Sequence, residues 1–193
     1  MEFNNIWSLD GFAVPPGFPR FDVSGGTCDD GMVIANYNQL KAFISSRHPA
    51  TASHSIRVRI QATALGLACG LSGPEMTVLS IAAEVHDVGK LLIPVSLLDK
   101  EGPLNEAEWG VMKTHAILGA KMSAIAFPSI PGIADCALLH HERFDGSGYP
   151  IGLTGEEIPI LVRIVAVADA FAALTEDRPY RRAYSETEAI RIL

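Results

Sequence analysis

The sequence has little that would place the chain in a membrane or in an oxidising compartment. No apolar run reaches the roughly 18–20 residues that cross a bilayer. The first residues, Met-Glu-Phe-Asn-Asn, lack the basic and apolar regions of a secretory signal. Only three cysteines occur, Cys28, Cys69 and Cys136, and they form no CxxC pair. An odd number of widely spaced cysteines is typical of free thiols. We therefore expect a cytoplasmic protein without membrane insertion.

Positive charge is also scarce. The net charge is −7 over 193 residues, which argues against binding to a nucleic-acid polymer. It does not exclude a small phosphate ligand, because bound metals would supply local positive charge. Hydrophobic residues make up 48% of the chain and charged residues 19%, a balance typical of a folded globular domain and not of a disordered one. The length suits a single domain.

Sustained alternation of apolar and polar residues is absent, whereas helical patterns recur from about Asn36 onward. Capping-box spacings begin three of the helices, at Ser72, Asn105 and Ser185, each with a Glu three residues later. The predicted helices cover approximately residues 36–44, 53–70, 73–87, 105–126, 133–142, 160–175 and 185–193. The sequence therefore predicts an all-α bundle.

The two ends of the chain differ from its middle. Residues 1–35 hold several prolines and glycines without a sustained period, so we predict an irregular N-terminal segment followed by one domain over residues 36–193. The last helix reaches Leu193 without a glycine stop signal, and we expect the domain to be truncated there. Gly146, Gly148, Gly152 and Gly155 predict a loop before the helix over residues 160–175.

Five of the six histidines stand in patterns that suggest metal binding. His86 precedes Asp87, His140 precedes His141, and two more lie singly in predicted helices, His54 and His115. Imidazoles and carboxylates together suit hard or borderline divalent metals. A carboxylate beside a histidine can bridge two metals while the histidine holds one of them. These residues predict a dinuclear hydrolytic centre.

Each candidate ligand also has a structural alternative. A lone histidine on an apolar helix face, such as His115, is more often a hydrogen-bonded core residue, and His48 is predicted to be a solvated loop residue. Asp169 is harder to dismiss, since a carboxylate in an apolar run costs several kcal/mol unless it is paired or metal-bound. His140 and His141 would point roughly 100° apart on a regular helix, so both can face one pocket only near a helix end. The metal centre explains these features jointly.

These residues lie within longer motifs, and through them the chain resembles the HD-GYP subgroup of the HD phosphohydrolase superfamily. The resemblance covers approximately residues 37–193. The matching motifs are His-Ser-Ile-Arg-Val (54–58), His-Asp-Val-Gly-Lys (86–90), Ile-Pro (93–94), Lys-Thr-His (113–115), His-His-Glu-Arg-Phe-Asp-Gly-Ser-Gly-Tyr-Pro (140–150), Gly-Glu-Glu-Ile-Pro (155–159), Ala-Val-Ala-Asp (166–169) and Asp-Arg-Pro-Tyr-Arg (177–181).

The resemblance implies an HD-domain helical bundle with a glycine-rich GYP loop, which hydrolyses cyclic di-GMP to linear pGpG and, in some members, onward to GMP. It implies two divalent metals, with Fe or Mn as the usual occupants and Zn, Ni, Co or Mg as others. One metal is expected on His54, His86, Asp87 and Asp169. The other is expected on Asp87, His115, His140 and His141, with Asp87 as the bridge.

The same resemblance assigns the residues that meet the substrate. Lys90 occupies the position of a phosphate-contacting lysine, and we expect it to be catalytic together with Asp87. The loop beside the substrate is expected to contain Gly148, Tyr149 and Pro150, and stacking of the tyrosine on guanine would contribute about 1–3 kcal/mol. Two arginines match positions that approach phosphate or base, Arg178 and Arg181.

The sequence departs from the family pattern in two positions besides its C-terminal end. Members with a third metal carry a Glu four residues before the first ligand histidine, where this chain has Ala50, and no acid occurs from Lys41 to Ser53. We therefore expect no third metal. Many members have an Asp three residues after the last ligand, where this chain has Ala172. That change places turnover in doubt more than metal binding.

Three functions remain open on this basis. The first is an active phosphodiesterase for a cyclic dinucleotide, either cyclic di-GMP or cyclic GMP-AMP. The second is a weakly active module that binds cyclic di-GMP or a protein partner, which Ala172 favours. The third is an HD-type nucleotidase, which the Gly-Tyr-Pro loop disfavours. Signalling proteins and a second copy of the chain are further candidate partners.

Overall fold

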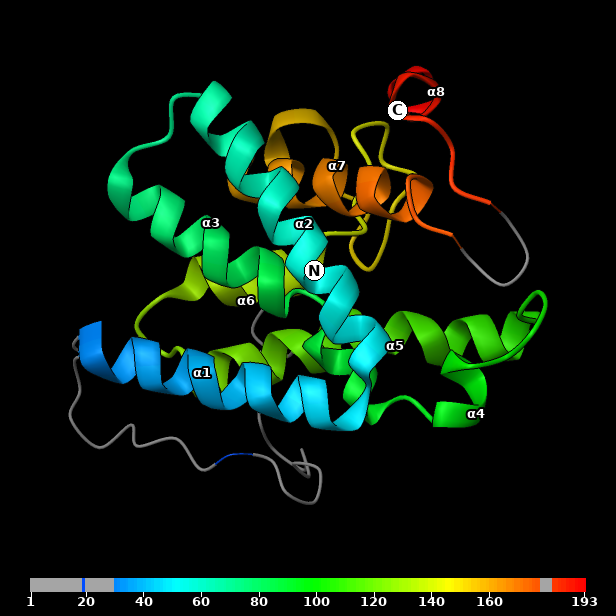
Figure 1. Cartoon of the computed structure of the whole chain (residues 1–193), viewed down its shortest axis with the longest axis horizontal. Coiled ribbons are helices and arrows are strands. Elements are labelled where there is room, and N and C mark those ends of the chain that lie inside the picture. The colour runs from blue at the N-terminus through cyan, green and yellow to red at the C-terminus, as the bar shows by residue number, and fades with distance from the viewer. Residues whose placement is uncertain (1–18, 20–29, 178–181) are drawn as a thin grey trace.

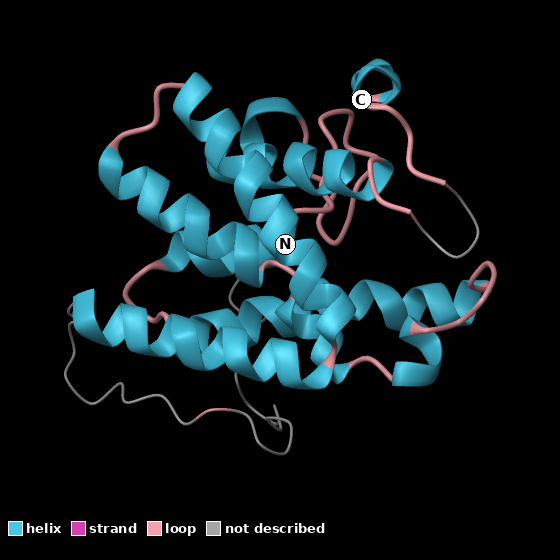
Figure 2. Cartoon of the chain, in the orientation of Figure 1, coloured by secondary structure: helices cyan, strands magenta, loops and turns pink. Residues whose placement is uncertain are grey.

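A computed structural model describes residues 19, 30–177 and 182–193 of the chain. Within these residues every regular element is helical (Figure 2), so the prediction of an all-α fold is confirmed. The α-helices are α1 (Asp30–Arg47), α2 (Pro49–Ala68), α3 (Gly73–Val85), α4 (Val95–Leu98), α5 (Glu106–Ala126), α6 (Pro131–Leu139), α7 (Ile160–Leu174) and α8 (Glu186–Ile192), and the two 3₁₀ helices are η2 (Val88–Leu92) and η3 (Gly155–Glu157).

The predicted capping boxes begin helices where the sequence placed them. Ser72 caps α3, Asn105 caps α5 and Ser185 caps α8, and in each box a Glu side chain accepts a hydrogen bond from the backbone N–H of the capping residue. These reciprocal bonds satisfy donors that would otherwise be unpaired at a helix start. Local sequence therefore sets the start of α3 and α5, which are two of the helices that position candidate metal ligands.

The first two helices begin earlier than predicted. The first starts at Asp30 and so extends into the segment expected to be irregular, most of which lies outside the described residues. The second starts at Pro49 because His48 is its N-cap, with Nδ1 accepting a hydrogen bond from the Thr51 N–H at 3.2 Å. The expectation that His48 is a solvated loop residue was wrong. Proline suits the first helical position because it has no N–H to leave unpaired.

The hydrophobic core brings together the helices that carry the candidate ligands (Figure 1). Helix α2 packs mainly against α3 and α7, while α5 packs against α6 and η2. Core side chains from these helices are fully buried, among them Val58, Leu79, Met122, Ile133 and Val162. As a result, segments more than a hundred residues apart in sequence meet near the centre of the bundle.

Gly89 allows η2 to lie directly on α5. A Cβ atom at this position would fall 1.9 Å from the backbone oxygen of His115 and 2.5 Å from the backbone nitrogen of Gly119. No side chain fits at such distances, so only glycine permits this approach. The contact holds Asp87, which precedes η2, against the α5 turn that carries His115.

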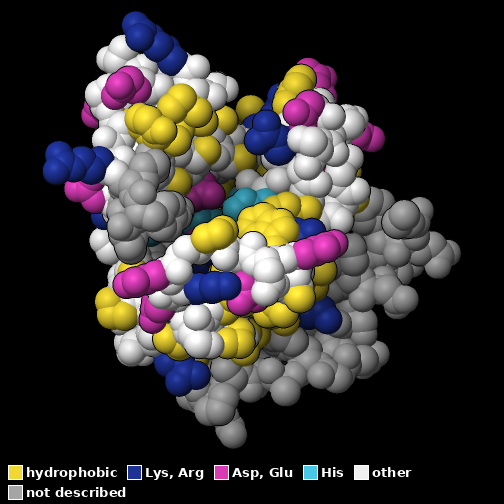
Figure 3. Space-filling model, turned by 90° about the vertical axis from the view of Figure 1, so that its right-hand side faces the viewer, with side chains coloured by type: hydrophobic (Ala, Val, Ile, Leu, Met, Phe, Trp, Pro, Cys, Tyr) yellow, Lys and Arg dark blue, Asp and Glu magenta, His cyan; other side chains and the backbone are white. Residues whose placement is uncertain are grey.

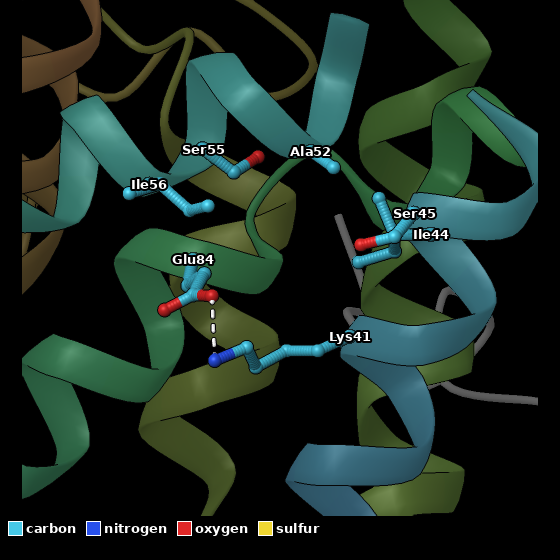
Figure 4. A pocket seen from close by; sticks show the side chains of 7 residues that line it. All are labelled: Lys41, Ile44, Ser45, Ala52, Ser55, Ile56 and Glu84. Carbon is cyan, nitrogen blue, oxygen red and sulfur yellow. Dashed lines mark ion pairs between the residues drawn. The ribbon is translucent and has the colours of Figure 1, made fainter. Parts of the chain in front are cut away.

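A buried acid joins the first three helices. The side chain of Glu84 on α3 is only 4% exposed, and its carboxylate lies 3.1 Å from Lys41 Nζ on α1 (Figure 4). The same carboxylate lies 2.7 Å from Arg59 Nε on α2. Tyr37, also on α1, donates a hydrogen bond of 2.5 Å to it. Burial, reinforced by this bond to a carboxylate, raises the pKa of Tyr37 above its ordinary value. The Glu84 cluster, comprising these four side chains, ties α1 to the helices that carry His54 and His86.

Among the described residues, none of the helices has both the length and the apolar character needed to cross a bilayer.

Candidate metal centre

Two groups of potential metal ligands meet at one buried aspartate. Each group offers nitrogen and oxygen atoms that all lie within 4.8 Å of one another. Both groups contain Asp87, which lies between the end of α3 and the start of η2. The first consists of His54, His86 and Asp87, and the second of Asp87, His115, His140 and His141. The shared carboxylate is the arrangement that the sequence predicted for a bridging ligand.

The first group also lies beside Asp169. His54 Nε2 on α2 is 2.8 Å from Asp169 Oδ1 on α7. His86 Nε2, at the end of α3, is 3.4 Å from Asp87 Oδ2 and 3.9 Å from Asp169 Oδ1. The partner that makes a carboxylate tolerable in the apolar α7 is thus a histidine from another helix. The structure brings together all four residues expected at the first metal.

The second group forms around the end of α6. That helix ends at Leu139, so His140 and His141 leave the regular helical repeat and turn toward the same space. His115 Nε2 lies 3.4 Å from His140 Nε2 and 3.1 Å from His141 Nε2. The same His115 nitrogen is 3.4 Å from Asp87 Oδ1, and that of His140 is 3.6 Å from it. The expectation that adjacent histidines share a pocket only near a helix end is met here.

Backbone carbonyls fix the tautomer of three of these histidines. Nδ1 of His86 lies 2.7 Å from the Ala83 oxygen, Nδ1 of His115 lies 2.6 Å from the Met112 oxygen, and Nδ1 of His140 lies 3.0 Å from the Ala137 oxygen. A carbonyl can only accept, so each Nδ1 carries the proton. In the neutral ring Nε2 then presents a lone pair, and all three lone pairs point into the same space.

These residues fit a pair of divalent cations. His86 Nε2 and Asp87 Oδ1 are buried and form no hydrogen bond, although an unpaired buried polar group costs about 1–3 kcal/mol. Acceptors that face one another at 3–4 Å repel unless a cation lies among them. Burial lowers the pKa of His115 to about 4, and burial with the neighbouring His140 and His115 lowers that of His141 to about 2. Both rings are therefore neutral near pH 7, the form that binds metal.

Both aspartates of the centre are ionised. Burial alone would raise the pKa of Asp87, but the charges of Lys90 and His86 hold it well below its ordinary value. Burial would likewise raise the pKa of Asp169, but its close contact with His54 Nε2 outweighs burial, so this pKa is also lowered. Two negative carboxylates beside the neutral rings of His115 and His141 give the centre negative charge that attracts cations.

Lys90 lies at the edge of the centre. Its Nζ is 2.5 Å from Asp87 Oδ2, and its side chain is 27% exposed. The two residues lie on one side of the 3₁₀ turn η2, for which Asp87 is the N-cap. Lys90 therefore has the position expected of a lysine beside the bridging carboxylate, while its contact with phosphate stays a prediction.

A buried glutamate, Glu142, holds the glycine-rich loop after α6 in place. Its carboxylate accepts hydrogen bonds from the backbone N–H groups of Ile151 at 2.7 Å, Gly152 at 3.0 Å and Leu153 at 3.0 Å. Gly148 allows the loop to fold back, because a Cβ there would lie 2.4–2.6 Å from backbone atoms of residues 141–143. Sequence analysis did not identify Glu142, and its place between the paired histidines and the glycines was the available signal.

The loop places Tyr149 against the centre. Its ring stacks on His141, with centroids 4.7 Å apart and an angle of 27° between the planes. Trp109 on α5 meets the tyrosine edge-on at 6.1 Å and is 45% exposed. Lys113 Nζ lies 5.9 Å from the centre of the Tyr149 ring. Trp109, Tyr149 and Lys113 form an entrance to the centre, which therefore combines exposed aromatic surface with positive charge.

Figure 3 shows this entrance as a hollow with histidine side chains at its base. Pro150 follows Tyr149 in the loop and is exposed. Arg178 and Arg181, the other residues expected to meet the substrate, lie outside the described residues. Ala50 is exposed on α2, one turn before His54, and Ala172 is 2% exposed on α7, so neither position offers a polar side chain to the centre.

Comparison with known proteins connects these features to one family. A model of the HD domain family matches residues 38–193. The cyclic di-GMP phosphodiesterase response regulator RpfG of Xanthomonas campestris is 47% identical over 127 residues, which cover 64% of this chain and 33% of that protein. The cyclic di-GMP phosphodiesterase PA4108 of Pseudomonas aeruginosa is 38% identical, with 73% and 34% covered. The 3'3'-cGAMP-specific phosphodiesterase 3 of Vibrio cholerae is 36% identical, with 86% and 36% covered.

The chain thus spans about a third of the length of these relatives. Solved structures share its fold at lower identity. Bd1817, an HDG"Y"P protein from Bdellovibrio bacteriovorus, aligns with a TM-score of 0.63 at 20% identity, over 83% of this chain and 56% of that one. The HD domain of the Listeria monocytogenes phosphodiesterase PgpH aligns with a TM-score of 0.60 at 20% identity, over 79% and 80%.

Proposed function

Because the chain belongs to the HD domain family, we propose that it is a metal-dependent phosphodiesterase that hydrolyses cyclic di-GMP to linear pGpG. The observation that carries the proposal is the pair of ligand groups joined at Asp87. Relatives that are 38–47% identical and are named cyclic di-GMP phosphodiesterases support the choice of substrate.

We assign the residues of the two groups to two metals. His54, His86, Asp87 and Asp169 would hold one, and Asp87, His115, His140 and His141 the other. Iron or manganese suits this mixture of imidazole and carboxylate. Two divalent cations there would supply a water of lowered pKa and positive charge beside the phosphoryl oxygens.

The protein's own groups would orient the substrate. From its place beside Asp87, Lys90 would donate to a phosphoryl oxygen and stabilise the negative charge that develops there. Tyr149 would stack on a guanine while its other face packs on His141. The loop backbone held by Glu142 keeps this ring in place, and Gly148 and Pro150 flank it. Arg178 and Arg181 would add contacts to phosphate or base.

We expect hydrolysis to stop mainly at pGpG. The reason is Ala50, which leaves no acid one turn before His54 to hold a third cation. Protein loaded anaerobically with Fe²⁺ or Mn²⁺ should therefore accumulate pGpG from cyclic di-GMP, with slow release of GMP, when the products are separated by chromatography. Rapid appearance of GMP without pGpG would contradict this expectation.

Metal content tests the assignment directly. Elemental analysis of the loaded wild type should give two metals per chain. Asp87→Ala should lose both metals and all activity, because both groups share this carboxylate. One metal or none in the wild type would refute the dinuclear centre. A wild type that binds cyclic di-GMP but never cleaves it with any divalent metal would instead identify a binding module, and Ala172→Asp would be the first change to test for restored turnover.

A second substrate has specific support. Relatives that are 36% and 37% identical are named 3'3'-cGAMP-specific phosphodiesterases. Parallel incubations with cyclic di-GMP and cyclic GMP-AMP decide between the two, and the substrate with the higher kcat/KM is the preferred one.

A further inference from the structure

His54 differs from three other histidines of the metal centre in what holds its ring. Nδ1 of His86, His115 and His140 is bound by a backbone carbonyl three residues earlier. His54 has its Nδ1 3.3 Å from Glu176 Oε2, a carboxylate 122 residues away in sequence. Its Nε2 points the other way, to Asp169 Oδ1 at 2.8 Å.

A residue of α2, the helix that carries His54, holds Glu176 in place. Its second oxygen, Oε1, forms an ion pair with Arg57, which lies three residues after His54 on α2. A hydrogen bond of 3.1 Å from Arg57 to Ser53 anchors the guanidinium in turn. The two oxygens of one carboxylate thus serve two neighbouring α2 side chains, and the Glu176 side chain is only 30% exposed. A solvated ion pair alone would not require the carboxylate to contact the imidazole as well.

The position of Glu176 also relates to Ala172. Position 172 on α7 is a buried alanine, which offers no polar side chain to the first ligand group. Glu176 comes four residues later, just after α7 ends at Leu174. A carboxylate is therefore present beside the first ligand group, but it arrives from the segment that follows the helix.

We propose that Glu176 is a positioning residue that keeps His54 in the tautomer with the proton on Nδ1, so that Nε2 is free for the metal shared with His86, Asp87 and Asp169. This inference rests on the proposed dinuclear centre. A carboxylate behind a ligating imidazole fixes the ring and raises its basicity, and removal of such a partner typically lowers metal affinity by about 10–100-fold. Arg57 orients Glu176 and has no direct contact with the metal.

Metal binding is the principal test. Metal-free wild type and variants are titrated with Mn²⁺ against a competing chelator, which gives two dissociation constants. Glu176→Ala should weaken one of them by roughly 10–100-fold and leave the other unchanged. Glu176→Gln, whose amide oxygen can still accept from Nδ1, should recover part of the loss. Glu156→Ala, at an exposed position on η3, is the matched control and should bind both metals normally.

The Nδ1 proton of His54 provides a second readout that does not depend on activity. In protein labelled with ¹⁵N-histidine and loaded with diamagnetic Zn²⁺, long-range ¹H–¹⁵N spectra distinguish a protonated Nδ1 from a protonated Nε2. Ligation of Zn²⁺ through Nε2 leaves the His54 proton on Nδ1 in every variant, so the readout is its hydrogen bond: the Nδ1 proton should resonate further downfield in the wild type and in Glu176→Gln, where an oxygen accepts it, than in Glu176→Ala.

The outcomes separate this inference from the proposed function. If Glu176→Ala binds two Mn²⁺ with wild-type constants, or if its His54 spectrum is unchanged, the positioning role is wrong while the dinuclear centre stands. If the wild type itself binds fewer than two Mn²⁺, the proposed centre fails and the inference falls with it.

Discussion

At the scale of single residues, a variant of Lys90 distinguishes substrate binding from catalysis. Its ammonium contacts the bridging carboxylate without belonging to either ligand group. Lys90→Ala should keep two metals and much of the affinity for cyclic di-GMP. It should lower kcat by roughly 10²–10³-fold, the scale observed when one preorganised donor is removed. Elemental analysis and steady-state kinetics check both parts, with Lys100→Ala on the surface as the control. Wild-type turnover by Lys90→Ala would rule out the assigned role.

Tyr149 should have the opposite kinetic signature. Stacking on a base persists through the reaction, so Tyr149→Ala should raise KM more than it lowers kcat. Tyr149→Phe keeps the ring that packs on His141 and should remain close to wild type. Initial rates over a range of cyclic di-GMP concentrations provide the measurement. A fall in kcat with unchanged KM for the alanine variant would place Tyr149 in the chemical step instead.

The candidate ligands could be predicted from the sequence because residue type and order alone indicate them, and the structure brings them together. Buried histidines and aspartates cost free energy unless a specific partner pairs with them. Adjacent His-Asp and His-His, and an aspartate in an apolar run, therefore indicate such partners. Glu142 and Glu176 escaped notice because glutamate is common in solvated loops. Their roles depend on which backbone groups or rings lie beside them after folding. No spacing rule links Glu176 to His54 across 122 residues.

At the scale of elements, the contact between η2 and α5 should depend on Gly89. Gly89→Ala places a methyl group in backbone atoms of His115 and Gly119, so η2 must move away from α5. Overpacking of this kind lowers the free energy of unfolding by about 1–3 kcal/mol or more, and it should also weaken the second metal site. Urea denaturation with Mn²⁺ titration measures both effects.

Gly110 provides the matched control for that experiment. It lies in the same helix, α5, and a Cβ there would meet no atom within 4 Å. Gly110→Ala should therefore raise the free energy of unfolding by about 0.5–1 kcal/mol, since alanine favours a helix interior over glycine. Equal stability changes in the two variants would mean that the η2–α5 approach has no special role.

Helix starts were predictable to the extent that side chains cap them. The capping boxes at Ser72, Asn105 and Ser185 are local, so four consecutive residues contain the signal. The start of α2 was missed because histidine is not among the usual capping residues, although its Nδ1 can accept like a carboxylate. The 3₁₀ turn of η2 also escaped, because it is imposed by the approach to α5 and not by local sequence.

At the scale of the whole molecule, the metal-free chain should stay folded. The helices that carry His54 and His86 are already joined by the core and by the Glu84 cluster. Removal of metal with a chelator should leave the far-UV circular dichroism of the protein unchanged and its thermal transition cooperative. Metal at a hundred times its dissociation constant should then add about 2.7 kcal/mol of stability per site by mass action. Loss of helical signal on chelation would show that the metals are needed for folding.

The Glu84 cluster has a consequence for which metal the protein carries in a cell. Because contacts remote from the ligands hold α2 and α3 in place, the ligand cage exists before any cation arrives. Folding therefore exerts no choice among metals. Intrinsic affinities of nitrogen and oxygen sites rise along the first-row series to copper, so affinity alone does not favour iron or manganese, the metals proposed for this centre. Under the proposed function, the occupancy of the centre, and with it the rate of hydrolysis, would follow the supply of free iron and manganese.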